Sequence, residues 1–203
     1  MNNTLSQRAD SIRANVGHRA INLFRVQSKK EIARPQSNVF CLTEKKGEEM
    51  RPFEDLKISK GRGPSVDENS ILNFEEQIGF KLPSSYVDLI MYSNGGHPEL
   101  DTFSAEDDEW SVSRFFSIEP EDTSTENVIW NYRHNKLRGL PDSLLPIAGD
   151  GGGNLFYLDL AYGEKAPVLI FIHDHDIPTR KLQKLAETFA DFIDGLHENP
   201  DYI

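Results

Sequence analysis

The sequence predicts an α+β domain over residues 65–199, in which a mostly antiparallel sheet is flanked by N-terminal helices and a C-terminal helix. Between residues 66 and 94, apolar residues recur every three or four positions, which is the helical period. Short alternating or apolar segments separated by turn residues follow up to residue 172, and a second helical stripe covers residues 182–196. Helices, then strands, then a helix is the element order of an α+β domain rather than of a regular βαβ repeat.

Two helices are expected at the start of the domain. Asp67 is a candidate N-cap of the first, and Gly79 is a candidate C-cap. Pro83 suits the first turn of the second, because a helix start leaves that N–H unpaired in any case, and Asn94-Gly95-Gly96 is expected to end it. The positions expected to be buried are Ile71, Phe74, Ile78, Tyr86, Leu89 and Ile90.

The middle of the domain is expected to be mostly strands. Residues 110–118 alternate with a period near two, and Gly-rich residues 150–154 separate two apolar segments. The expected elements are a strand over 110–118, a helix over 121–134 with Val128, Ile129 and Tyr132 inward, and strands over 144–148, 155–160 and 168–172. The last expected element is one helix over Leu182–Leu196 behind a Thr179 N-cap.

Composition limits the class of protein. The 203 residues are 37% hydrophobic, 27% charged and 10% aromatic, which suits one sizeable core and excludes collagen-like and low-complexity chains. The longest apolar run, Val168–Ile172, is far shorter than the roughly 20 residues of a membrane-spanning helix, so we expect no membrane contact by the domain. Cys41 is the only cysteine, which excludes an internal disulfide, and residues 1–8 lack the apolar core of a secretory signal. A cytoplasmic location is expected.

The net charge of −11 is unevenly distributed. Residues 1–63 hold 13 Lys and Arg against 7 Asp and Glu, a charge of +6, so residues 64–203 carry the remaining −17. An acidic domain repels phosphate backbones, so we expect no nucleic-acid binding by it and a basic protein as its partner.

Residues 1–64 are expected to be a basic extension and linker. Residues 5–24 can form an amphipathic helix with Arg8, Arg13 and Arg19 on its polar face. Three interpretations stay open for this segment: an organelle-targeting peptide, a basic helix that binds a membrane surface or partner, and a loosely ordered extension upstream of a natural start at Met50. Residues 26–64 are polar and are expected to be mostly linker.

No motif predicts catalysis, a metal or a cofactor. The glycine run at Gly149–Gly153 lacks the spacing of a dinucleotide-binding loop and precedes a strand, so it is expected to be a turn. His173 and His175 would share one face of an extended strand, but no third ligand is evident. No Gly-x-Ser-x-Gly elbow is present. A metal-dependent hydrolase using these two histidines is therefore the least favoured alternative.

An acidic stretch is the candidate partner-binding surface. Charged groups speed the encounter with an oppositely charged partner, and an aromatic side chain supplies an anchor that is buried on binding. The alternative is a solvated loop that only maintains solubility. The candidate residues are Glu99, Asp101, Glu106, Asp107, Asp108, Glu109 and Trp110.

Four sequence blocks between Phe74 and Leu196 resemble the SMI1/KNR4 family, also called the SUKH superfamily. They occur in the family's order: a helix ending in Gly79, Leu-Pro-x-x-Tyr at 82–86 before a helix ending in Asn-Gly, an Asp-Gly-Gly-Gly-Asn turn at 150–154 between strands, and a closing helix around 185–193. Residues 1–63 have no counterpart in this pattern. The resemblance implies an SMI1/KNR4-like fold without catalytic residues, in which the motif positions are structural.

The resemblance also implies a binding function. Many bacterial members of the family are immunity proteins that neutralise a cognate polymorphic or contact-dependent toxin, often a nuclease or deaminase. Eukaryotic members include regulators of cell-wall synthesis and other interaction proteins. The leading hypothesis is therefore a non-catalytic immunity protein that binds a basic toxin domain, and the alternative is an intracellular regulatory or scaffold module.

Overall fold

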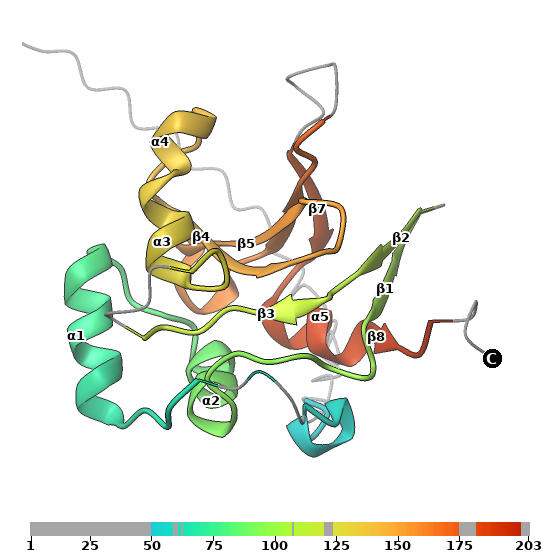
Figure 1. The fold of residues 1–203 in the computed structure, drawn as a ribbon, viewed down its shortest axis with the longest axis horizontal. Coiled ribbons are helices and arrows are strands. Elements are labelled where there is room, and N and C mark those ends of the chain that lie inside the picture. Colours follow the sequence, from blue (N-terminus) through green and yellow to red (C-terminus); the bar gives the residue numbers. More distant parts are fainter. Residues whose placement is uncertain are drawn as a thin grey trace, which may run out of the picture. The chain divides into compact units, whose positions relative to one another are not determined.

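The computed structural model describes residues 50–58, 61, 63–106, 108–119, 124–174 and 182–199. Two sheets and five short α-helices make up this part of the chain (Figure 1). The expected α+β class is confirmed, with helices, antiparallel sheets and a C-terminal helix. The expected helix over residues 5–24, Cys41, Asp107, His175 and Thr179 lie outside the described residues.

The two N-terminal helices begin and end where local signals place them. In α1 (Glu68–Ile78), the Asp67 carboxylate accepts hydrogen bonds from the Ser70 backbone N–H and hydroxyl, which lower the pKa of Asp67. Gly79 ends α1 with a left-handed φ of 76°. Helix α2 (Ser84–Tyr92) starts after Pro83, with Tyr86, Leu89 and Ile90 buried as expected, and it ends before Asn94.

A buried carboxylate joins α1 to α2. Glu75 is 8% exposed, and its Oε1 accepts the Leu82 backbone N–H at 2.9 Å while Lys81 pairs with its Oε2. At the start of α2, the Glu164 carboxylate accepts the Ser84 backbone N–H at 3.0 Å. Both contacts satisfy N–H groups that have no partner within a helix.

The larger sheet has the strand order β3-β4-β5-β6-β7, and every pairing in it is antiparallel. Its strands are β3 (Arg114–Phe115), β4 (Leu144–Gly149), β5 (Leu155–Asp159), β6 (Val168–Phe171) and β7 (Leu182–Ala186). The short helix η2 (Leu160–Lys165) links β5 to β6. The three central strands agree with the expected ones to within a residue or two.

A smaller sheet has the order β2-β1-β8, with β1 (Thr102–Ala105), β2 (Asp108–Ser111) and β8 (Leu196–His197). The single strand expected over residues 110–118 is wrong, because the chain leaves β2 in the small sheet and enters β3 in the large one. Both segments have strand-like sequences, so a period of two does not show that the chain changes sheets between them.

The expected helix over Leu182–Leu196 is also wrong in its first part. Residues 182–186 form β7 on the edge of the large sheet, and the C-terminal helix α5 covers only Phe189–Gly195. Pairing with β6 overrides the helical spacing of Leu182 and Leu185. The true start carries a local signal, since Thr188 is an N-cap whose Oγ1 accepts the Asp191 backbone N–H at 3.1 Å.

Between β3 and β4 along the chain, the helix expected over residues 121–134 begins only at Val128. Helix α3 (Val128–Arg133) is capped by Asn127, whose side chain accepts the Trp130 backbone N–H at 3.1 Å. Val128 and Ile129 are buried as expected, and Tyr132 is half-buried. Helix α4 (Asn135–Arg138) follows directly.

Residues 50–58 belong to the packed structure, although the sequence pattern places them in the linker. Phe53, Leu56 and Ile58 are 8%, 0% and 1% exposed, with Phe53 and Leu56 in the short helix η1 (Phe53–Leu56). The Arg51 side chain donates to the backbone carbonyls of Asp194 and Leu196 at the end of α5. The core therefore begins before the boundary expected at residue 65.

Aromatic side chains bring α2, α5 and both sheets together. Phe192 of α5 packs on Phe103 of β1 and Phe156 of β5, with ring centroids 5.0 and 5.7 Å apart. Tyr86 of α2 meets Phe189 of α5 edge to face at 5.2 Å. One core thus supports both sheets.

The hydroxyl of Tyr86 is the exception within this core. Tyr86 is 1% exposed, and its hydroxyl is the one fully buried side-chain polar atom without a hydrogen-bond partner among the described residues. Burial raises the pKa of this phenol. Nothing in the structure explains why tyrosine rather than phenylalanine stands here.

We expect Tyr86→Phe to increase the free energy of unfolding by about 1 kcal/mol, because the ring contacts stay and an unsatisfied hydroxyl is removed. Urea denaturation followed by circular dichroism measures the change. A loss of stability of similar size would show that the hydroxyl has a partner in solution.

Candidate functional site

The acidic residues predicted to bind a partner gather around the β1–β2 hairpin. Ala105 pairs with Asp108, and Glu106, which follows Ala105, has a left-handed φ of 55°. Glu106, Asp108 and Glu109 are exposed and form no ion pair with another described residue. We call these three the acidic hairpin tip.

The other predicted residues are engaged at the base of the hairpin. The Asp101 carboxylate accepts the Thr102 hydroxyl at 2.9 Å, and the exposed Glu99 pairs with Lys57 at 3.3 Å. Trp110 is half-buried and lies opposite Phe103, whose ring is part of the core. Glu99 and Asp101 therefore have internal partners, and Trp110 has one side in the core.

Strand β2 lies at an edge of its sheet, beyond β1 (Figure 1). An edge strand presents backbone N–H and C=O groups that can pair with another chain. Asp108 and Glu109 place negative charge on this edge, which disfavours pairing with a second acidic copy and favours a basic partner.

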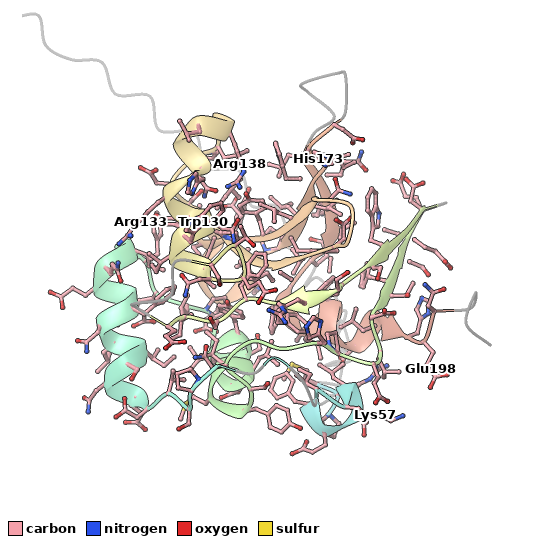
Figure 2. The ribbon with its side chains drawn as sticks, viewed as in Figure 1. Lys57, Trp130, Arg133, Arg138, His173 and Glu198 are labelled. Carbon is pink, nitrogen blue, oxygen red and sulfur yellow. The ribbon has the colours of Figure 1, made fainter. Side chains whose placement is uncertain are left out.

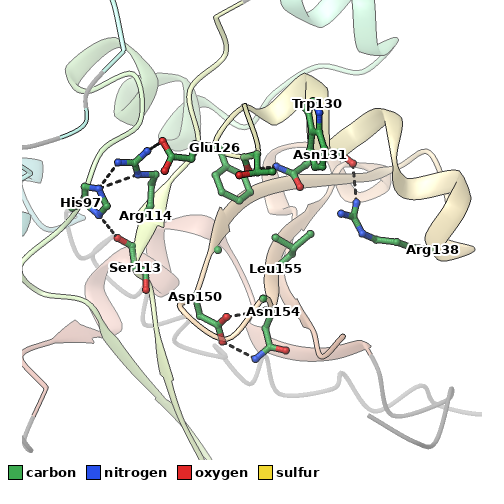
Figure 3. A pocket seen from close by; sticks show the side chains of 14 residues that line it. His97, Ser113, Arg114, Glu126, Trp130, Asn131, Arg138, Asp150, Asn154 and Leu155 are labelled. Atoms are coloured by element: carbon green, nitrogen blue, oxygen red, sulfur yellow. Dashed lines mark hydrogen bonds and ion pairs between the residues drawn. The ribbon is translucent and has the colours of Figure 1, made fainter. Parts of the chain in front are cut away.

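A second surface feature was not predicted from the sequence. A bowl of about 430 Å³ lies beside the start of β3, between α3 and the β4–β5 turn (Figure 3). Phe116, Gly149 and Leu155 provide its apolar lining, which we call the floor. A Cβ at Gly149 would come within 3.1 Å of the Phe116 ring. The residues around the floor that carry polar groups are His97, Ser113, Arg114, Thr125, Glu126, Trp130, Asn131, Arg138, Asp150 and Asn154.

One side of the bowl is an ion pair supported by a histidine. Arg114 forms an ion pair with Glu126, and its Nε donates to His97 Nε2 at 3.0 Å. His97 Nδ1 lies 2.6 Å from the Ser113 carbonyl oxygen, which can only accept, so Nδ1 carries the proton and Nε2 is the acceptor. Burial lowers the pKa of the Arg114 guanidinium.

The β4–β5 turn forms the opposite side. Asp150 Oδ1 accepts the backbone N–H groups of Gly152 and Asn154, both at 2.8 Å, and Asp150 Oδ2 accepts Asn154 Nδ2 at 2.6 Å. Asn154 Oδ1 in turn accepts the His173 backbone N–H at 3.1 Å. The Asp150 carboxylate therefore stabilises the turn, in agreement with the expected role of this glycine-rich segment.

The third side comes from α3 and α4. Asn131 is 2% exposed, and its Nδ2 donates to the backbone carbonyls of Thr125 at 2.7 Å and Asn127 at 3.1 Å. Arg138 Nη1 donates to the Asn131 backbone carbonyl at 2.9 Å, and no described carboxylate forms an ion pair with Arg138. The Arg138 guanidinium also interacts with the Tyr157 hydroxyl. Arg138 and Asp150 are therefore the two charged side chains of the bowl that form no ion pair with another described residue.

The bowl could not have been identified from any spacing in the sequence. His97, Arg114, Glu126, Arg138 and Asp150 come from separate segments, and of these only Asp150 is part of a recognisable motif. Only the turn at 150–154 had a recognisable sequence signal. That signal predicted the shape of the turn but not which residues lie beside it in the bowl.

No metal site is formed by the described residues, in which no three His, Cys, Asp or Glu side chains come together. His173 is exposed, and since His175 lies outside the described residues, the pairing of the two histidines stays a prediction. Within the same part of the chain, no helix has the length and apolar character needed to cross a membrane.

Comparison with known proteins identifies similarity over most of the described chain. The model of the SMI1 / KNR4 family (SUKH-1) matches residues 65–195. The chain is also 25% identical over 168 residues to the SPbeta prophage-derived uncharacterized protein YokK of Bacillus subtilis (strain 168), an alignment that covers 73% of this chain and 84% of that protein. Residues 65–195, which the family model matches, include both the acidic hairpin tip and the bowl.

Proposed function

Because this chain belongs to the SMI1/KNR4 (SUKH-1) family, we propose that it is a non-catalytic immunity protein that neutralises a cognate toxin by binding it. The observation that carries this proposal is the acidic hairpin tip on an edge strand, with three exposed carboxylates that have no cationic partner among the described residues. The same tip lies within residues 64–203, whose net charge is −17, and this suits a basic protein surface.

A nuclease toxin is the partner class that this charge suits best. A nuclease must bind phosphate groups, so its active face tends to be basic. An acidic hairpin can compete with nucleic acid for that face, while its own charge keeps nucleic acid from binding to it. We further propose that Glu99, Asp101, Asp107 and Trp110 border this contact, with Glu106, Asp108 and Glu109 at its centre.

A binding function without chemistry agrees with the state of the carboxylates in the bowl. Glu126 is paired with Arg114, and Asp150 accepts three hydrogen bonds from its own turn. A general base needs a carboxylate that is free to accept a proton from a substrate. Neither of these two carboxylates has that freedom.

Rescue of growth tests the proposal. Cells that express a candidate toxin domain should survive when this protein is co-expressed and die without it. If co-expression does not rescue the cells and the purified proteins do not bind each other, the immunity function is wrong for that pair.

The alternative function is an intracellular regulatory or scaffold module that uses its basic N-terminal segment to recruit another partner. Deletion of residues 1–44 separates the two, because it removes basic residues but leaves all described residues, including the buried Phe53, Leu56 and Ile58. An immunity protein should keep its rescue activity, and a scaffold should lose its localisation or regulation. We also propose that the basic extension ends before Met50.

The acidic hairpin tip is expected to control the rate of association with the toxin. In the variant Asp108→Lys with Glu109→Lys, local attraction at these two positions becomes local repulsion, so the association rate at low salt should fall about tenfold or more. Stopped-flow or surface plasmon resonance measurements over a range of salt concentrations give this rate. Its salt dependence should also become flatter.

A matched control changes the same amount of charge elsewhere. Glu76→Lys with Asp88→Lys alters two exposed acids on α1 and α2, away from the hairpin in Figure 1. Its association rate should stay within about twofold of the unmodified protein, because screening weakens interactions beyond roughly 8–10 Å. Equal effects of both variants would mean that net charge, rather than the hairpin, governs encounter.

A further inference from the structure

Three kinds of group in the lining of the bowl retain binding capacity that no described residue uses. Arg138 supplies a guanidinium without a carboxylate partner, Asn131 supplies an amide oxygen, and Phe116 and Leu155 supply apolar surface (Figure 3). Glu126 and Asp150, in contrast, already have internal partners. The part of the bowl beside Arg138 is therefore complementary to an anion next to an apolar group, while Asp150 places a negative charge at the β4–β5 turn.

The amide oxygen of Asn131 is the most specific of these groups. Its Nδ2 atom donates to two backbone carbonyls, which can only accept, so the orientation of the amide is determined and Oδ1 is the remaining atom. No described residue donates to Oδ1, although Asn131 is 2% exposed. Asn131 lines the bowl, and its Oδ1 is not among the fully buried unpartnered side-chain atoms of the described residues. A ligand in the bowl can therefore donate to it.

We propose that the bowl binds the C-terminal residue of a partner polypeptide. The terminal carboxylate binds Arg138, the N–H of the same residue donates to Asn131 Oδ1, and a bulky apolar side chain packs on Phe116 and Leu155. A volume of about 430 Å³ accommodates one large side chain with its backbone groups.

A terminal residue suits the bowl better than an internal acidic one. Successive side chains of an extended segment point to opposite faces, so an internal carboxylate and its apolar neighbour do not enter the same bowl. A terminal residue carries its carboxylate and side chain on one Cα. A free amino acid also carries an ammonium group, for which the bowl offers only the Asp150 carboxylate, and this group already accepts three hydrogen bonds from its own turn, whereas Glu126 is paired with Arg114.

The proposal does not rest on the immunity function, because it concerns a different surface and a different ligand charge. Ser113 on the rim lies two residues beyond β2, so a single partner could contact both surfaces, but neither contact requires the other. The variant Asp108→Lys with Glu109→Lys should therefore bind the peptide below as the unmodified protein does.

The test uses the full chain labelled with ¹⁵N and the peptide N-acetyl-Ala-Ala-Phe with a free carboxylate. The Asn131 side-chain amide and the Trp130 indole N–H are expected to shift and saturate, with a dissociation constant on the order of 1 mM. The C-terminal amide of the same peptide should bind roughly tenfold more weakly, since it lacks the charge-assisted hydrogen bond. N-acetyl-Asp-Phe-amide should bind as weakly as that amide.

Two arginine variants provide the matched pair. Arg138→Gln should lose the preference for the acid over the amide, whereas Arg133→Gln, an exposed arginine on the neighbouring α3, should keep it (Figure 2). Equal binding of acid and amide to the unmodified protein, or no shift at Asn131 and Trp130, would overturn the proposal without reference to any variant. Binding of N-acetyl-Asp-Phe-amide as strong as that of the acid would overturn the assignment to a chain terminus.

Discussion

Replacement of Leu56 by alanine should lower the free energy of unfolding by about 3 kcal/mol, within the range measured for fully buried leucines. Leu56 is 0% exposed and lies in η1, in a part of the chain whose composition resembles a linker. The loss of core contacts and the remaining cavity both contribute to the effect. For a domain of this size, the midpoint of thermal unfolding should fall by roughly 6–12 °C.

Leu72→Ala is the matched control, because it removes the same atoms from a leucine that is 54% exposed on α1. Its cost should be below about 1 kcal/mol, since alanine is a good helix former and little burial is lost. Urea denaturation of both variants measures the difference. Similar effects of the two substitutions would mean that residues 50–58 pack only loosely on the domain.

Gly95→Ala should be the second strongly destabilising substitution, with a cost of about 2–4 kcal/mol from backbone strain and overpacking together. Gly95 has a φ of 84°, and a Cβ there would lie 3.0 Å from the Ser117 backbone nitrogen and 3.1 Å from the Phe115 carbonyl oxygen. These atoms belong to the segment that bridges Gly96 to Phe115, so they cannot move away without breaking that pairing.

Gly139→Ala separates strain from packing. Gly139 has a similar φ of 71°, but a Cβ there would meet no atom within 4 Å. Its cost should be about 1 kcal/mol, the price of a left-handed alanine alone. Thermal unfolding of the two variants, compared side by side, gives the contribution of the close approach at Gly95. If they are equally destabilised, the Asn-Gly pair after α2 is needed only for its turn.

Local signals predicted much of the fold because the interactions that end an element are themselves local. Asp67 and Gly79 are within a few residues of the groups they cap, so α1 could be placed from sequence alone. The turn at Asp150–Asn154 is satisfied by its own backbone and side chains, and it was expected for the same reason. The Thr188 N-cap was an equally local signal that the longer apolar stripe obscured.

The segment over residues 182–186 shows where such signals fail. Its apolar spacing fits a helix, but the free edge of β6 offers backbone partners that a helix in this position would leave unpaired.

The residues of the acidic stretch also differ in their surroundings in a way that the sequence does not show. Charge density placed seven residues together, yet Glu99 and Asp101 have partners at the hairpin base while Glu106, Asp108 and Glu109 are exposed at its tip.

The sequence by itself determined the family, the α+β class, the two capped N-terminal helices and the charge of the domain, since each depends on residue types or on neighbours along the chain. Only the tertiary structure decided that residues 50–58 enter the core, that residues 182–186 join a sheet and that the bowl exists. Burial, strand pairing and concave surfaces are made by residues far apart in the sequence, and their energies exist only once those residues are brought together.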